Sequence, residues 1–224
     1  MMLDHRAYTG QLAALSRSTE VMVGDISRSE TMAEIAVDVL RDAPPRFALV
    51  GLSMGGIVAF EIWRRAAERV THLALLDTTP YVDAPERQTL RLEQIAMVET
   101  GKLRDVLMNS MKPLYLAKKN RANGRLVQRI LDMALAAGPD VFRRQSLALR
   151  NRPDSTGTLQ TITCPAFVLC GREDALCPVD IHATMAAVLP RADLHVLAEC
   201  GHLSTMEEPA AVTSALRRLL GRSS

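Results

Sequence analysis

The sequence has no hydrophobic run that approaches the roughly 20 residues needed to cross a membrane. Its N-terminus has neither the basic nor the apolar region of a signal peptide. The four cysteines form no C-x-x-C pair and have no histidines at the spacing of a zinc site. Nucleotide-binding motifs, internal repeats and low-complexity tracts are also absent. These absences predict a cytoplasmic protein with reduced, mostly buried thiols and with no metal or other cofactor.

The net charge is small, but the charges are unevenly distributed along the sequence. The net charge of the 224 residues is +2, yet residues 86–152 carry 14 Lys and Arg against 6 Asp and Glu. This basic segment, with Arg143, Arg144, Arg150 and Arg152 as examples, indicates either an anionic small-molecule substrate or a solvated helical face. We expect no nucleic-acid or membrane partner, and the sequence leaves the oligomeric state open.

The apolar segments that are present alternate with helical patterns. Strands are predicted over 20–25, 47–52, 72–77, 166–170 and 193–197, with helices over 7–15, 31–41, 178–189 and 208–220. Such alternation is typical of an α/β fold in which a parallel sheet is flanked by helices. The 48% hydrophobic content fits one domain spanning 1–224.

Between residues 85 and 152 the alternation stops. Every pattern in this segment is helical, over 86–100, 103–111, 126–137 and 139–150, and Gly101 and Gly138 are placed as C-terminal stops. An all-helical insertion between strands of a parallel sheet predicts a cap over the strand ends. The predicted cap spans approximately 85–152.

One motif dominates the sequence. Gly51-Leu-Ser-Met-Gly55 joins a predicted buried strand directly to a predicted helix, as in a nucleophile elbow. The tight turn predicts that side chains at positions 51 and 55 would collide with backbone, and that Gly56 lets the helix approach more closely. Ser53 is therefore the candidate nucleophile, held in a strained and exposed conformation. An idle serine in a glycine-rich turn is the alternative.

A serine nucleophile needs a general base, and the base needs a carboxylate to orient it. Among the five histidines, only His202 follows a predicted strand end in a glycine-flanked loop, where such chemistry gathers in open parallel sheets. Asp174 follows the strand 166–170 in a tight loop and is the candidate acid. Asp77 also ends a strand and is its rival, although capping the start of the helical insertion suits it better. Glu173 is expected to point the other way.

These motifs resemble the α/β-hydrolase superfamily, and more narrowly its small lidded esterase-like and MenH-like members. The resemblance is carried by Gly51-Leu-Ser-Met-Gly-Gly, by Val168-Leu-Cys-Gly-Arg-Glu-Asp174, and by Cys200-Gly-His202 with Met206-Glu-Glu-Pro209. The chain order Ser, Asp, His is the order of that superfamily. The resemblance covers nearly the whole chain and implies a Ser53–His202–Asp174 triad with a helical cap.

The sequence departs from the family at the oxyanion hole. The family takes one N–H from the residue after the nucleophile, here Met54, and a second from an upstream loop marked by His-Gly or Pro-Gly. Neither dipeptide occurs before Ser53. The resemblance implies an N-terminally shortened fold in which Met1 or Met2 occupies the donor position. We expect either a chain whose natural start lies further upstream, or flanking strands that close up, or a degraded, weakly active member.

The function expected from these features is hydrolysis of a small carboxylic ester or thioester through an acyl-enzyme. The alternatives are a catalytically impaired or non-catalytic ligand-binding protein and, among enzymes, a MenH-like lyase or a C–C hydrolase. Substrate-binding residues stay unassigned. Several methionines could line a pocket under the cap or fill the core, namely Met54, Met97, Met108, Met111 and Met133.

Overall fold

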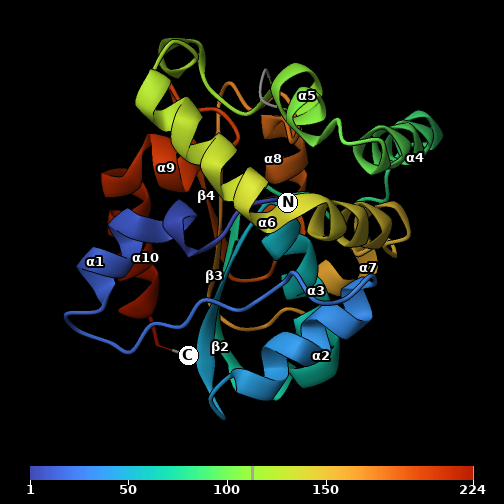
Figure 1. Ribbon diagram of the computed structural model, residues 1–224. Helices are drawn as coiled ribbons and strands as arrows, with labels where there is room; N and C mark the ends of the chain where they lie inside the picture. The colour runs from blue at the N-terminus through green and yellow to red at the C-terminus, as the bar shows by residue number, and fades with distance from the viewer. Residues whose placement is uncertain (112–113, 224) are drawn as a thin grey trace.

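The computed structural model describes residues 1–111 and 114–223 and has a four-stranded sheet at its centre (Figure 1). The strands are β1 (Phe47–Leu52), β2 (Val70–Leu76), β3 (Ala166–Gly171) and β4 (Ala192–Leu197). They lie in the order β1-β2-β3-β4, and each neighbouring pair is parallel. Their carboxyl ends therefore share one edge of the sheet, and the predicted α/β class with a parallel sheet is confirmed.

The predicted strand over residues 20–25 is wrong. These residues lie outside the sheet, and Val21, Met22 and Val23 are all exposed. A strand is held by hydrogen bonds to a neighbour, and in the described part of the chain β1 pairs with β2 alone. An apolar run with no adjacent strand to pair with stays extended and unpaired.

The flanking helices form where the sequence predicts them. The N-terminal part contains the 3-10 helix η1 (His5–Tyr8), α1 (Thr9–Leu15) and α2 (Met32–Asp42). The Thr31 hydroxyl accepts the Glu34 N–H at 3.2 Å, so the predicted cap of α2 is present. The remaining flanking elements are α3 (Met54–Ala66), the 3-10 helix η2 (Ala67–Arg69), α8 (Val179–Val188), α9 (Ser204–Glu207) and α10 (Pro209–Leu220).

Two apolar cores cover the two faces of the sheet. Leu73 and Leu75 of β2 belong to a core shared with α2, α3 and α8. The alternate residues Ala74 and Leu76 belong to a second core shared with α1 and α10. The period of two along β2 therefore buries both faces, as expected for a parallel sheet covered by helices. In Figure 1, α1 and α10 lie on the opposite side of the sheet from α2 and α3.

The regular elements described between β2 and β3 are all helices. The elements are α4 (Pro85–Glu99), α5 (Leu103–Val106), the π-helix η3 (Leu107–Met111), the 3-10 helix η5 (Lys118–Asn120), α6 (Gly124–Arg150) and α7 (Thr156–Leu159). Gly101 and Gly138 both have positive φ, 85° and 80°, where the preceding helical turns stop. Phe142, Leu131 and Val106 anchor a third apolar core within this segment. None of the helices in residues 1–111 and 114–223 is both long and apolar enough to cross a bilayer.

Candidate active site

Ser53 stands alone between β1 and α3 in a strained backbone conformation. Its φ of 54° and ψ of −117° are unusual for a residue with a side chain. A Cβ at Gly51 would lie 2.5 Å from the Gly55 carbonyl oxygen, and one at Gly56 would lie 2.5 Å from Thr78 Oγ1. These close approaches confirm the tight turn predicted at the elbow. The expected collision at Gly55 is wrong, since a Cβ there would meet nothing within 4 Å.

The structure brings Ser53, His202 and Asp174 into one hydrogen-bonded chain. His202 Nε2 lies 2.8 Å from Ser53 Oγ, and His202 Nδ1 lies 2.8 Å from Asp174 Oδ2. His202 and Asp174 are both buried, whereas Ser53 is partly exposed. With Nδ1–H donating to the carboxylate, Nε2 is free to accept the Ser53 hydroxyl proton.

Backbone groups orient both partners of the serine. Asp174 Oδ1 accepts the N–H groups of Leu176 at 2.8 Å and Cys177 at 3.0 Å, which leaves Oδ2 for the imidazole. The His202 N–H donates to the Tyr115 carbonyl oxygen at 2.9 Å. The neighbouring Glu173 points elsewhere, as predicted, because its carboxylate accepts the Lys118 N–H at 2.8 Å.

Asp77, the rival acid, is buried, and its carboxylate bonds to backbone N–H groups instead of to the imidazole. Its carboxylate accepts the N–H of Gly171 at 3.1 Å and the N–H of Ser204 at 3.0 Å. Burial, and then the charge of Asp174, raise the pKa of Asp77 well above its ordinary value. The interpretation that Asp77 caps the start of the helical insertion is wrong, since its two carboxylate oxygens accept N–H groups at the end of β3 and at the start of α9.

The other histidines lie away from the Ser53 hydroxyl, and one of them, His182, bonds to the segment that follows β2. His72 contacts Thr71 and the Arg222 carbonyl, and His195 packs edge-on against Phe167. His182 on α8 is fully buried, and its Nε2 accepts the Thr78 N–H at 3.0 Å. Its helical pattern gave no sign of this contact, because it depends on how α8 packs against the end of β2.

The N–H of Met54 is the first amide of α3 and by position has no acceptor within the helix. It therefore presents a donor beside Ser53, where the helix dipole also favours negative charge. The Met2 N–H, expected near the second donor position, donates to Gln145 Oε1 at 2.7 Å. In this conformation Met2 is engaged with α6 instead of facing an oxyanion.

A narrow apolar pocket includes Tyr115, a neighbour of His202. Met2 lines it together with side chains from the segment between β2 and β3. Those side chains are Leu107, Met108, Tyr115, Val127, Ile130, Leu131 and Ala134. The Tyr115 ring stacks on His202 with a centroid separation of 6.0 Å. Tyr115 therefore belongs to both the pocket and the surroundings of the base, and the sequence carried no motif that marked it.

The methionines expected in a pocket or in the core do not share one role. Met108 lines the pocket. Met54 and Met133 are core residues, and Met97 is exposed. The side chain of Met111 lies outside the described residues.

The four cysteines are free, and three of them are buried. One, Cys177, forms with Asp174 and His202 a buried group whose ligand atoms lie within 4.8 Å of one another. Oxygen, sulfur and nitrogen ligands of this kind suit zinc. A metal held there would take both Asp174 and His202 away from Ser53. The hydrogen-bonded chain is therefore the simpler interpretation, and the absence of a metal stays a prediction.

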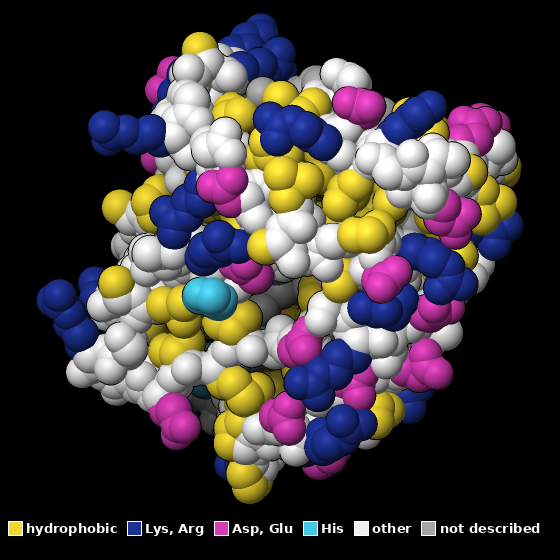
Figure 2. All heavy atoms as spheres, in the orientation of Figure 1, with side chains coloured by type: hydrophobic (Ala, Val, Ile, Leu, Met, Phe, Trp, Pro, Cys, Tyr) yellow, Lys and Arg dark blue, Asp and Glu magenta, His cyan; other side chains and the backbone are white. Residues whose placement is uncertain are grey.

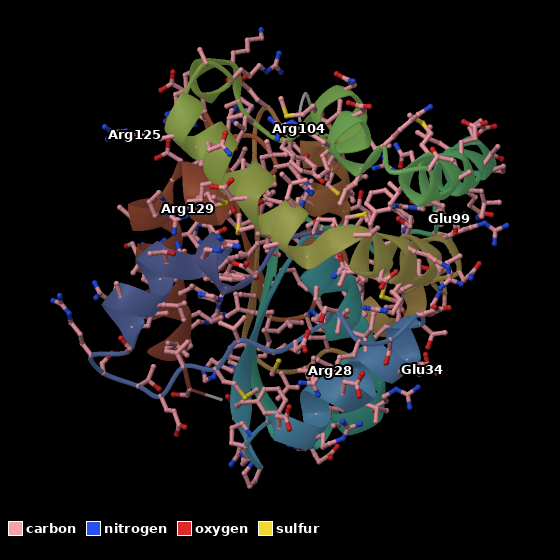
Figure 3. All side chains as sticks on the ribbon, in the orientation of Figure 1. Arg28, Glu34, Glu99, Arg104, Arg125 and Arg129 are labelled. Carbon is pink, nitrogen blue, oxygen red and sulfur yellow. The ribbon has the colours of Figure 1, made fainter. Side chains whose placement is uncertain are left out.

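The basic segment is largely engaged with the rest of the protein. Arg152 pairs with Asp83 in a buried contact, Arg143 pairs with Glu30, and Arg144 donates to the Ser27 carbonyl. Figure 2 shows Lys and Arg side chains interspersed with Asp and Glu over the face in view. In Figure 3, Arg125 points away from the body of the molecule at the start of α6. These positions favour a solvated surface over an anion site, and an anionic substrate stays a prediction.

Comparisons with known proteins show the family and the fold of the chain. Residues 3–215 match the model of the alpha/beta hydrolase family. The chain is 28% identical over 208 residues to a 2-hydroxy-6-oxononadienedioate/2-hydroxy-6-oxononatrienedioate hydrolase of Paraburkholderia phymatum, covering 88% of this chain and 70% of that protein. It is 26% identical over 183 residues to a pimeloyl-acyl-carrier protein methyl ester esterase of Vibrio parahaemolyticus, covering 80% of this chain and 72% of that protein.

A solved structure extends the likeness to the whole fold. A thermophilic esterase from Thermogutta terrifontis aligns with a TM-score of 0.87 at 30% sequence identity. The alignment covers 97% of this chain and 85% of the esterase. The arrangement of the sheet and its helices is therefore shared with an esterase over nearly the full length.

Proposed function

The chain belongs to the alpha/beta hydrolase family, and on that premise we propose that it is a serine hydrolase of small carboxylic esters or thioesters. The observation that carries the proposal is the chain of two 2.8 Å contacts from Ser53 through His202 to Asp174. The similarity to esterases, including a 30% identical solved structure, supports an ester substrate. A cytoplasmic location, expected from the sequence, accompanies this proposal as a prediction.

The reaction proceeds in two halves. Ser53 Oγ attacks the acyl carbon while His202 Nε2 takes its proton, and Asp174 stabilises the imidazolium that forms. His202 then gives the proton to the departing alcohol or thiol, which leaves an acyl group on Ser53. In the second half, water loses a proton to His202 and attacks the acyl carbon. The bond from the acyl carbon to Ser53 Oγ then breaks, His202 returns the proton to Ser53 Oγ, and the acid is released.

The negative charge that develops on the acyl oxygen falls to the Met54 N–H at the start of α3. Removing one oxyanion donor typically lowers the rate by about 10² to 10³. Because the Met2 N–H bonds to Gln145, we expect slow turnover in this conformation.

We also propose that the helices between β2 and β3 form the cap and that the pocket lined by η3, Tyr115, α6 and Met2 receives an apolar part of the substrate. The pocket is lined by apolar side chains and the Tyr115 ring, which stacks on His202. An aliphatic chain placed there would bury apolar surface beside the base, at about 0.8 kcal/mol per CH₂.

A second candidate is hydrolysis of a carbon–carbon bond, favoured by the 28% identity to the Paraburkholderia phymatum hydrolase. Both reactions use water and a polarised carbonyl carbon. Turnover of a vinylogous diketone in preference to esters would favour this candidate.

The experiment that tests the proposal is labelling with a fluorophosphonate, read by intact mass and followed by turnover of p-nitrophenyl esters. We expect one adduct on the wild-type protein and none on Ser53→Ala. Ser146→Ala removes a buried serine of α6 and serves as the control that keeps the adduct. A folded wild-type protein that takes up no label would favour a ligand-binding protein instead.

A further inference from the structure

Residues at the carboxyl end of β2 contact the segments that hold the nucleophile, the acid and the base. The Leu76 carbonyl accepts the Ser53 N–H at 2.8 Å, and Thr78 Oγ1 donates to the Ser53 carbonyl at 2.7 Å. Ser53 is therefore held on both sides of its strained backbone by β2. The Ser53 carbonyl also accepts the N–H groups of Gly56 at 2.9 Å and Ile57 at 3.3 Å at the start of α3, so the Thr78 hydroxyl adds a contact from outside the helix.

Asp77 contacts the other two segments. One carboxyl oxygen accepts the N–H of Gly171, three residues before Asp174, and the other accepts the N–H of Ser204, two residues after His202. The Asp77 N–H donates to the Leu169 carbonyl at 2.9 Å, which ties the same residue to β3. The Asp77 side chain thus joins the end of β3, just before Asp174, to the start of α9, just after His202.

The conformation of Asp77 is specialised for this contact. Its φ of 46° is positive, and its side chain is completely buried. Both carboxyl oxygens are occupied by backbone N–H groups, so the carboxyl does not orient the imidazole. If the Asp77 carboxylate moved away, the buried N–H groups of Gly171 and Ser204 would lose their acceptors at a cost in free energy. The contact therefore favours one position of the segments that carry them.

Thr78 is fixed from behind. Its N–H donates to His182 Nε2 at 3.0 Å, and His182 Nδ1 contacts the Pro178 carbonyl at 3.1 Å, so Nδ1 carries the proton. On its other side, Thr78 Oγ1 would lie 2.5 Å from a Cβ at Gly56. The threonine is thus confined between α8 and the start of α3.

We propose that Asp77 and Thr78 are positioning residues, with Asp77 setting His202 against Asp174 and Thr78 setting Ser53 against His202. The inference rests on the proposed function of these three residues as a triad. It goes beyond that function because neither positioning residue touches the substrate or takes part in proton transfer. The two residues act on different contacts, so their variants are expected to differ in kind.

The test combines labelling kinetics with a signal that needs no turnover. The proton on His202 Nδ1, hydrogen-bonded to Asp174, gives a far-downfield ¹H NMR resonance. The variants are Asp77→Asn, which keeps one acceptor oxygen, and Thr78→Val, which replaces the hydroxyl by a methyl group of similar size. The control is Thr213→Val, which removes a part-buried hydrogen bond to the Pro209 carbonyl within α10.

We expect Asp77→Asn to shift or broaden the downfield resonance and to lower kcat by about 10- to 100-fold, with KM changed by less than about threefold. We expect Thr78→Val to slow labelling of Ser53 by about tenfold while the resonance stays in place. Thr213→Val is expected to change neither, although all three variants lower the melting temperature. If Asp77→Asn does not fold, Thr78→Val and its unchanged resonance still test the separation.

Two outcomes would overturn the inference. One is a folded Asp77→Asn protein with the wild-type resonance and wild-type kcat. The other is a Thr78→Val protein that labels at the wild-type rate. Failure of the proposed function looks different, since the wild-type protein would then show the resonance but no adduct at Ser53.

Discussion

The strand ends and the helical segment between β2 and β3 organise their functional groups differently. At the strand ends, Asp174, His202 and Ser53 are each held by backbone N–H or carbonyl groups at 2.8–3.0 Å. In the helical segment, the pocket is lined by side chains that touch one another through apolar contacts. Backbone hydrogen bonds fix direction, whereas apolar packing fixes volume. On the proposed function, the first region carries the chemistry and the second the selectivity.

The largest expected effect tests the strand ends. Asp174→Asn is expected to lower kcat by a factor on the order of 10⁴, because an amide N–H₂ facing Nδ1 favours the wrong imidazole tautomer. Steady-state turnover of a p-nitrophenyl ester measures the loss. Glu173→Gln is the matched control, since that carboxylate bonds to the Lys118 N–H and should leave kcat within about threefold. Equal losses in the two variants would contradict the assignment of the acid.

The next effect concerns the start of the helical segment, where Asp83 is buried between Arg91 and Arg152. Asp83→Asn leaves two buried guanidinium groups without a counter-charge, so the free energy of unfolding should fall by about 3–5 kcal/mol. Denaturant unfolding measures it. The control is Asp193→Asn, which breaks an exposed pair with Arg222 and should change stability by about 0–1 kcal/mol. A loss in Asp83→Asn no larger than in this control would show that the buried cluster does not stabilise the segment.

A smaller effect sharpens the role of the pocket. Val127→Phe fills part of its volume and is expected to lower kcat/KM for long-chain esters about tenfold more than for acetate esters. A chain-length series of p-nitrophenyl esters provides the comparison. Val37→Phe, at an exposed position on α2, should leave the chain-length profile unchanged. A uniform loss across all chain lengths in Val127→Phe would count against the pocket as a substrate site.

The smallest expected effect is a pH dependence. Burial lowers the pKa of His182 below its usual 6.5, against an opposing contribution from the Pro178 carbonyl and the nearby Asp174. The folded protein therefore binds fewer protons here than the unfolded chain, so stability is present above about pH 6.5 and declines as the pH falls below it.

Melting temperatures between pH 5 and 8 measure this slope. His182→Gln should flatten it, whereas His5→Gln, at an exposed position, should not. His195 is shifted in the same direction, so part of the slope should persist. An unchanged slope in His182→Gln would remove His182 as its source.

Local patterns were enough for most of the secondary structure and for the Ser53–His202–Asp174 chain. Phe47–Leu52 is a strand because its apolar run ends at a glycine turn, and Gly138 stops a helix because it adopts positive φ. His202 and Asp174 could be chosen because parallel strands bring their carboxyl ends to one edge. Such inferences need only the order of elements along the chain.

Other features needed the partner that only the folded chain supplies. Residues 20–25 have the composition of a strand but lack a neighbouring strand to pair with. Gly55 has room for a side chain, although the elbow motif predicted a collision there. The end of β2 is joined to α8 by the Thr78–His182 contact, to the elbow by Thr78, and to the start of α9 by Asp77. No spacing in the sequence relates these positions. The sequence by itself determined which groups reach the edge of the sheet, because strand direction and turn chemistry are local. Tertiary structure alone decided what holds them there, because hydrogen bonds between distant segments depend on packing.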